Sequence, residues 1–286
     1  MARTADFHSA NPGSIPGGVN HMQPELDIGP ITLQTFGIMF ALGFVAAGAL
    51  VGRRFQELGK PVDWAYELIF AGLVGGIVGA RIDFLIENYD SVSDDLLGNL
   101  FSGSGLVWYG GVIGGAIGVL LWARWRGMLD LTLLDLAAPG LAIGYAIGRI
   151  GCQLSGDGDY GIPWDGPWAM AYPEGTVATD VPVHPTPIYE TLAMGLVTYA
   201  LWRLRFSFRP GLLFALYLVL AGAERFLIEF IRRNDELLLG LTQAQLLSVV
   251  MIAAGGAWLM VKGRRGELRA DGSGTQGAPM ERAAST

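Results

Sequence analysis

Three arginines stand inside long apolar stretches of the sequence, where a cation is normally excluded. They are Arg81 and Arg149, each expected to end a glycine-rich helix, and Arg225. A charge near the centre of a bilayer costs at least about 2.5–3.5 kcal/mol on insertion scales, so such residues usually face a cavity and a partner. Because a guanidinium stays charged and binds phosphate bidentately, these arginines predict a phospholipid-headgroup site. The alternatives are snorkelling to the interface and, for Arg225, a structural pair with Glu229.

Two more charged residues follow Arg225 at helical spacing. Glu229 comes four residues later and Arg232 three residues after that. The spacing i, i+4, i+7 predicts that all three side chains lie on one helical face. Glu229 is therefore expected to hold Arg225 in place.

The segment from His184 to Glu190 opens the fifth apolar stretch with several polar side chains. His184 lies close to Tyr189 and Glu190, whereas the other two histidines precede every apolar stretch. A histidine titrates near neutral pH and serves as a general base or as a donor to a headgroup. The alternative is that His184 caps the helix while the neighbouring prolines fix its direction.

Tyr109 lies beside paired glycines in the third apolar stretch. Glycines that recur every four residues there indicate close helix packing, although Tyr109 could instead present its hydroxyl to a cavity. The single cysteine, Cys152, excludes a disulfide framework and a cysteine-rich metal site. We expect no metal and no cofactor.

Seven apolar stretches must position these side chains. The chain is 51% hydrophobic and only 16% charged, whereas soluble domains carry about 25% charged residues. A spanning helix needs roughly 20 mostly apolar residues. The candidate spans are Ile31–Val51, Ala65–Ile86, Gly105–Ala123, Leu131–Gly148, Pro187–Trp202, Gly211–Phe230 and Ala244–Val261. The sequence thus predicts an all-α, multi-pass membrane protein with about seven transmembrane helices.

The loops predict the orientation. Lysine and arginine concentrate after the first, third, fifth and seventh stretches, and only Arg232 and Arg233 break this pattern. By the positive-inside rule, the N-terminus lies outside and the C-terminus lies in the cytoplasm. The net charge of −7 hides this distribution, and no nucleic-acid partner is expected.

Three regions are expected along the chain. Residues 1–28 are predicted to be a disordered tail, residues 29–265 the transmembrane domain, and residues 266–286 a second, cytoplasmic tail. Between spans four and five, the stretch from about Cys152 to Val183 is rich in Trp and Tyr, which settle at headgroup level. We interpret it as an arm on the periplasmic side of the membrane.

In their order along the chain, these motifs resemble those of the prolipoprotein diacylglyceryl transferase family, from about Leu33 to Val261. Residues 148–161 resemble the signature Gly-Arg-x-Gly-Asn-Phe-x-Asn-x-Glu-x-x-Gly, with one extra residue before Gly161. Residues 184–190 resemble His-Pro-x-Gln-Leu-Tyr-Glu, and residues 225–232 match Arg-Phe-x-x-Glu-Phe-x-Arg. Four positions depart from the family pattern: Cys152 replaces Asn, Asp157 replaces Glu, Tyr109 replaces the His of a His-Gly-Gly motif, and Phe36 replaces a Tyr.

The resemblance implies transfer of diacylglycerol from phosphatidylglycerol to the cysteine thiol of a prolipoprotein lipobox, in the bacterial inner membrane. It implies that Arg149 and Arg225 stabilise the leaving phosphate, and that the signal peptide and membrane lipid are the partners. For the thiol proton it leaves three candidates, with His184 first, then Asp157 and Tyr109. The expected substrate-binding residues are Arg81, Asp157, Tyr189, Glu190 and Arg232.

Two other functions stay open at this point. One is a divergent paralogue that binds anionic phospholipid and modifies another acceptor or none, as the departures at Tyr109, Cys152 and Phe36 suggest. The other is an anion transporter, since intramembrane arginines also line ion paths. Against a transporter, the sequence has no internal repeat of the kind that many transporters carry.

Overall fold

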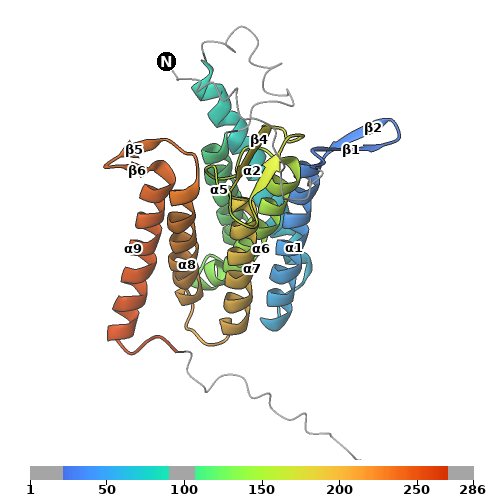
Figure 1. Cartoon of the computed structure of the whole chain (residues 1–286). Helices are drawn as coiled ribbons and strands as arrows, with labels where there is room; N and C mark the ends of the chain where they lie inside the picture. The colour runs from blue at the N-terminus through green and yellow to red at the C-terminus, as the bar shows by residue number, and fades with distance from the viewer. Residues whose placement is uncertain (1–21, 90–106, 270–286) are drawn as a thin grey trace, which may run out of the picture.

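The chain folds as an upright bundle of helices in a computed structural model that describes residues 22–89 and 107–269 (Figure 1). The seven α-helices in these residues are α1 (Thr35–Glu57), α2 (Asp63–Glu87), α5 (Trp108–Arg126), α6 (Leu131–Ser155), α7 (Thr186–Leu204), α8 (Leu212–Ile228) and α9 (Gln243–Arg264). A 3₁₀-helix, η2 (Glu229–Ile231), follows α8 directly.

Three small antiparallel sheets lie at one end of the bundle (Figure 1). They pair β1 (Glu25–Ile28) with β2 (Ile31–Gln34), β3 (Met170–Tyr172) with β4 (Thr179–Val183), and β5 (Glu236–Leu238) with β6 (Leu241–Thr242). The segment between α6 and α7, which contains β3 and β4, covers the ends of the central helices. The site described below lies beneath it.

Every predicted apolar stretch overlaps one of these helices, so the mostly helical fold is confirmed. Four helices (α1, α2, α6 and α9) are long and apolar enough to cross a membrane. Of the others, α8 has 17 residues, and α5 and α7 have 19 each. Composition and length alone therefore support four spans.

Several predicted boundaries are wrong. The N-terminal tail was expected to reach residue 28, but Glu25–Ile28 forms β1 and pairs with Ile31–Gln34 through a turn in which Gly29 has φ of 63°. At the other end, Lys262 Nζ donates to Glu267 at 2.6 Å, so residue 267 folds back on α9. Residues 1–21 and 270–286 of the expected tails lie outside the described residues. Neither Arg81 nor Arg149 ends its helix, because α2 continues to Glu87 and α6 to Ser155.

Glycines bring α2 and α5 into backbone contact, as the four-residue repeat predicted. A Cβ on Gly79 would lie 2.2 Å from the carbonyl oxygen of Gly110, and a Cβ on Gly114 would lie 2.2 Å from that of Gly75. These distances leave no room for any side chain. The α2–α5 pair is therefore fixed by its glycines.

Helix α6 packs against α1, α7 and α8 and so holds the centre of the bundle. It begins at Asp130, whose carboxylate accepts from the backbone N–H groups of Thr132 (2.8 Å) and Leu133 (3.3 Å). It ends at Gly156, which has φ of 57° and turns the chain out of the helix. Between α6, α7 and α8 lies a core of small and apolar side chains: Ala138, Ala142, Ala146, Met194, Leu201, Leu213 and Ala221.

Candidate functional site

A completely buried carboxylate, Glu190, joins three arginines from separate parts of the chain. Its Oε2 lies 3.1 Å from Arg149 Nε, and its Oε1 lies 3.1 Å from Arg225 Nη1. Arg232 Nη1 lies 3.5 Å from Oε2. The side chain of Glu190 has 0% exposure, so its charge depends on these cations for compensation.

Local structure places Glu190 at the start of α7, facing α6. Pro187 lies in the first turn, where a missing N–H costs nothing. The hydroxyl of Thr186 donates to the carbonyl of Asp159 at 2.6 Å, and that of Thr191 donates to the carbonyl of Ala146 at 3.2 Å. These two bonds fix the first turns of α7 against α6 and the loop after it.

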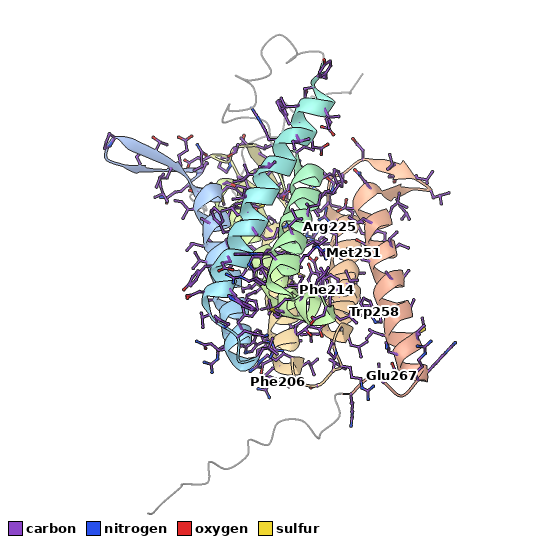
Figure 2. The ribbon with its side chains drawn as sticks, turned by 180° about the vertical axis from the view of Figure 1, so that it is seen from behind. Phe206, Phe214, Arg225, Met251, Trp258 and Glu267 are labelled. Atoms are coloured by element: carbon purple, nitrogen blue, oxygen red, sulfur yellow. The ribbon has the colours of Figure 1, made fainter. Side chains whose placement is uncertain are left out.

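Glu229 forms a second buried centre beside the first. It accepts from Arg225 Nη2 at 2.9 Å, which confirms the predicted pair. It also accepts from Asn234 Nδ2 at 2.6 Å and Thr242 Oγ1 at 2.8 Å. Arg225 thus bridges two carboxylates, in the half of the bundle nearer β5 and β6 (Figure 2).

The predicted helical face from Arg225 to Arg232 is only partly correct. Helix α8 ends at Ile228, the chain tightens into η2, and Arg232 has an extended backbone. Arg232 nevertheless returns to the site, where its Nη1 reaches Glu190 and its Nη2 pairs with Asp159. The turn, rather than a continuous helix, brings it there.

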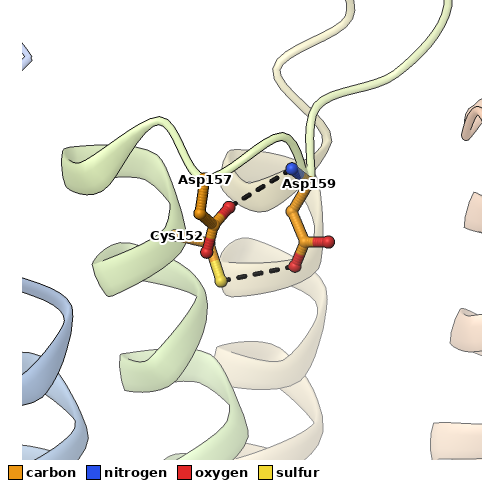
Figure 3. Close-up of side chains that lie close together, drawn as sticks. All are labelled: Cys152, Asp157 and Asp159. Atoms are coloured by element: carbon orange, nitrogen blue, oxygen red, sulfur yellow. Dashed lines mark hydrogen bonds between the residues drawn. The ribbon is translucent and has the colours of Figure 1, made fainter. Parts of the chain in front are cut away.

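Asp159 is the third carboxylate and pairs with both Arg149 and Arg232. Burial acts to raise the pKa of Asp159, but the two guanidinium charges outweigh it and hold the pKa below its ordinary value. Cys152 Sγ lies 3.4 Å from Asp159 Oδ2, and the backbone N–H of Asp159 donates to Asp157 Oδ1 at 3.2 Å (Figure 3). Burial raises the pKa of Asp157.

The group of Cys152, Asp157 and Asp159 has the donor types of a metal site, with atoms within 4.8 Å of one another. Both oxygens of Asp159, however, are engaged by guanidinium groups. These two positive charges would repel a metal cation. The group is therefore better suited to ion pairing than to metal binding.

The arginines still have hydrogen-bonding capacity for an anion. Nε and Nη1 of Arg232 are buried without a hydrogen-bond partner among the residues that the structure describes, and they lie 3.8 Å from Glu229 Oε2 and 3.5 Å from Glu190 Oε2 in looser ion pairs. Arg149, Arg225 and Arg232 come from three directions and are held by Glu190, Glu229 and Asp159. Fixed cations whose donors are incompletely used are suited to phosphate.

His184 and Tyr189 belong to a different cluster. The His184 ring stacks on Trp164 with centroids 4.3 Å apart, and its Nδ1 lies 3.4 Å from the Tyr189 hydroxyl. That hydroxyl accepts from Trp168 Nε1 at 2.6 Å. Burial lowers the pKa of His184. Within the described residues these contacts form an aromatic cluster beside the start of α7, and the roles expected of His184 and Tyr189 stay predictions.

Arg81 and Tyr109 belong to the α2–α5 pair. Arg81 is buried, and its guanidinium lies 5.1 Å from the centre of the Phe84 ring. Within residues 22–89 and 107–269, none of the ion pairs of Glu190, Glu229 and Asp159 involves Arg81. Tyr109, at the start of α5, is 44% exposed. Phe36 starts α1 beside Gly151.

Sequence reasoning missed four contributors to the arginine site: Tyr145, Asp159, Asn234 and Thr242. The Tyr145 hydroxyl donates to Glu190 Oε1 at 3.0 Å, and its ring lies 4.9 Å from the Arg149 guanidinium. The four-residue spacing of Tyr145 and Arg149 on one helix was a usable signal. Nothing in the sequence, by contrast, links Asp159 to Arg232, since the two are 73 residues apart.

Comparison with known proteins agrees with the motifs. The family model for prolipoprotein diacylglyceryl transferase matches residues 24–261. The chain is 36% identical to a phosphatidylglycerol–prolipoprotein diacylglyceryl transferase of Dehalococcoides mccartyi, over 79% of this chain and 88% of the relative. A protein of the same name from Clostridium tetani is 33% identical over 74% of this chain and 86% of the relative. Another from Bordetella parapertussis is 33% identical over 81% of this chain and 94% of the relative. The chain therefore belongs to the prolipoprotein diacylglyceryl transferase family.

Proposed function

We propose that this chain transfers the diacylglyceryl group of phosphatidylglycerol to the lipobox cysteine thiol of prolipoproteins. The names of its relatives support both substrates. The observation that carries the proposal is the convergence of Arg149, Arg225 and Arg232 on Glu190. Charges drawn from separate elements to one place suit a ligand whose own charge is concentrated on a phosphate.

The reaction makes negative charge grow on that phosphate. The substrate thiolate attacks the carbon of the diacylglyceryl group that bears the phosphate. A C–S bond forms there, and the bond between that carbon and the phosphate oxygen breaks. Glycerol phosphate leaves as a monoester with one more negative charge than the diester had. Positive groups fixed where this charge develops lower the barrier. Arg149 and Arg225 take this role, with Arg232 beside them, while Glu190 and Glu229 hold the guanidinium planes.

The other expected substrate contacts fit around this centre as part of the same proposal. Arg81 assists at the headgroup from the α2–α5 pair, and Asp157 and Tyr189 line the approach of the substrates. We propose no metal or cofactor for the reaction. Asp157 lies in the loop after α6 beside Cys152, and Tyr189 lies one residue before Glu190.

The proposal includes a topology. All seven helices cross the bacterial inner membrane, with the N-terminus outside and the C-terminus in the cytoplasm. Arginine and lysine near the ends of α1, α5, α7 and α9 support this orientation by the positive-inside rule. The three sheets and the arginine site then face the outer leaflet, where a secreted prolipoprotein would present its lipobox.

The test is mass spectrometry of a lipobox peptide incubated with purified protein and phosphatidylglycerol. The wild-type protein adds the mass of diacylglycerol to the peptide, and Arg149→Ala and Arg225→Ala each lower the rate by at least about a hundredfold, as removal of one preorganised donor typically does. Arg205→Ala is the matched control, because Arg205 pairs with Glu57 (2.9 Å) at the opposite end of the bundle. Full activity in either site variant would refute the arginine clamp.

A further inference from the structure

The transfer needs a group that accepts the thiol proton, and the sequence offered His184, Asp157 and Tyr109 for this role. Tyr109 starts α5, which packs against α2, and His184 stacks among the aromatic residues near β4. Glu190 and Glu229 have side chains with 0% exposure. Both also lie between guanidinium groups, with which they form ion pairs.

Glu224 is a carboxylate of α8 that lies outside the ion pairs described above. Tyr217, Ala221 and Glu224 follow at spacings of four and three residues and therefore share one face of the helix. Ala221 and Tyr217 pack into the core formed with α6 and α7. Helix α9 meets another side of α8, at Gly222. Glu224 therefore faces α6 and α7, as the arginine site does.

Glu224 lies among the charged groups of the site, and within residues 22–89 and 107–269 it forms no ion pair. The charges of Glu190, Arg225, Arg149 and Arg232 all act on it, and it acts on Tyr145 and Tyr217. Its Oε1 is buried without a hydrogen-bond partner in the described residues, while the side chain as a whole is only partly buried. An intramembrane carboxylate in this state is costly to keep and normally has a function.

The charges of the site suit Glu224 to take up a proton. Three guanidinium groups already face three carboxylates: Glu190, Glu229 and Asp159. An ionised Glu224 adds one uncompensated negative charge beside the place where the phosphate would bind. Uptake of one proton removes that charge at the moment when the leaving phosphate gains one. The total charge of the site then stays constant through the reaction.

We infer that Glu224 is the proton acceptor for the substrate thiol, an inference that rests on the proposed function. The S–H bond breaks, and an O–H bond forms on the Glu224 carboxylate. The thiolate then forms the C–S bond to glycerol, and the electron pair of the broken C–O bond leaves with the phosphate. One proton, one thioether and one phosphate monoester account for every atom and charge.

The test compares Glu224→Gln with the wild-type protein in kcat and KM across pH. Glutamine keeps the shape of the side chain but cannot accept the proton. We expect kcat to fall at least about a hundredfold, within the range of a general base, with KM for phosphatidylglycerol changed less than threefold. Raising the pH towards about 8.5, where a free thiol ionises by itself, should restore activity selectively in Glu224→Gln.

The titratable and charged groups around Glu224 are Tyr145 and Arg149 from α6, Glu190 from α7, Tyr217 and Arg225 from α8, and Arg232 after η2. The tyrosines and arginines ordinarily titrate at about pH 10 or above. Tyr217→Phe, on the same face of α8, is the matched control and should keep the wild-type profile.

Three outcomes overturn the inference. The first is a Glu224→Gln protein whose kcat lies within threefold of wild type. The second is a loss of activity that high pH does not restore, or a matching rise in KM, which would show that Glu224 only supports the binding site. The third is a wild-type protein that adds no diacylglycerol to the peptide at any pH, and only this result removes the proposed function as well.

Discussion

Glu190→Gln is the substitution that tests the arginine site most directly. Glu190 is fully buried and faces guanidinium nitrogens of Arg149 and Arg225 at 3.1 Å and of Arg232 at 3.5 Å, and it accepts from Tyr145 at 3.0 Å. Glutamine fits the same space. It removes the negative charge and replaces one acceptor oxygen with an NH₂ group that points donors at the arginines.

The expected magnitude follows from these contacts. Removing one partner of a buried ion pair costs about 3–5 kcal/mol, because the remaining charge stays buried and unpaired. Glutamine keeps one carbonyl oxygen, so we take the lower end, about 3 kcal/mol. If this cost appears as misplaced guanidinium groups in the transition state, kcat/KM falls about a hundredfold, since about 1.4 kcal/mol is a factor of ten.

The assay measures kcat/KM with phosphatidylglycerol and a lipobox peptide, alongside thermal unfolding in the same detergent. Glu57→Gln is the matched control. Glu57 is also a largely buried acid between two arginines, 2.6 Å from Arg54 and 2.9 Å from Arg205, but it ends α1 at the far end of the bundle. It should lower the unfolding temperature and leave kcat/KM within about twofold, since it lies outside the proposed transition-state contacts.

A folded Glu190→Gln protein whose kcat/KM stays within threefold of wild type would contradict this prediction. Such a result would mean that the arginines hold their positions without the carboxylate. A Glu57→Gln protein that loses as much kcat/KM as Glu190→Gln does would also contradict it. The loss would then reflect global destabilisation rather than the geometry of the site.

Two further predictions concern stability. Gly79→Ala places a Cβ 2.2 Å from the carbonyl oxygen of Gly110 and should destabilise the protein by about 1–3 kcal/mol through overpacking. Gly256→Ala is the control and should not destabilise the protein, because a Cβ there would meet nothing within 4 Å. Equal unfolding midpoints for the two variants would contradict this prediction. Asp159 has a pKa below its ordinary value, so its stabilising effect is present above the unfolded pKa of about 3.9 and is lost as pH falls through the folded pKa. Asp159→Asn should therefore make the unfolding temperature less dependent on pH below about 4, and an unchanged dependence would refute the ion-pair explanation.

The sequence by itself determined the helices and much of the arginine site. Long apolar runs are a local property of the chain, and in a bilayer each run must satisfy its own backbone by forming a helix. The pairing of Arg225 with Glu229 is local as well, because side chains four residues apart are neighbours on a helix. Arg149 and Arg225 marked the site because burying a cation without a function is costly, whereas Arg81 belongs to the α2–α5 pair.

Tertiary structure alone decided which side chains meet. The convergence of Arg149, Arg225 and Arg232 on Glu190 depends on how α6, α7 and α8 pack. That packing is fixed by small residues in contact, such as Ala146 and Ala221, rather than by the polar residues themselves. A periodic pattern places a side chain on a face of its helix, but only the neighbouring helices decide what that face touches.

The same limit explains the predictions that differed. The end of α8 in η2 redirects Arg232. Asp159 joins the site from a loop, 10 residues after Arg149 and 73 before Arg232. Contacts between residues so far apart carry no periodic signal, because their geometry depends on loops and turns that no local pattern specifies.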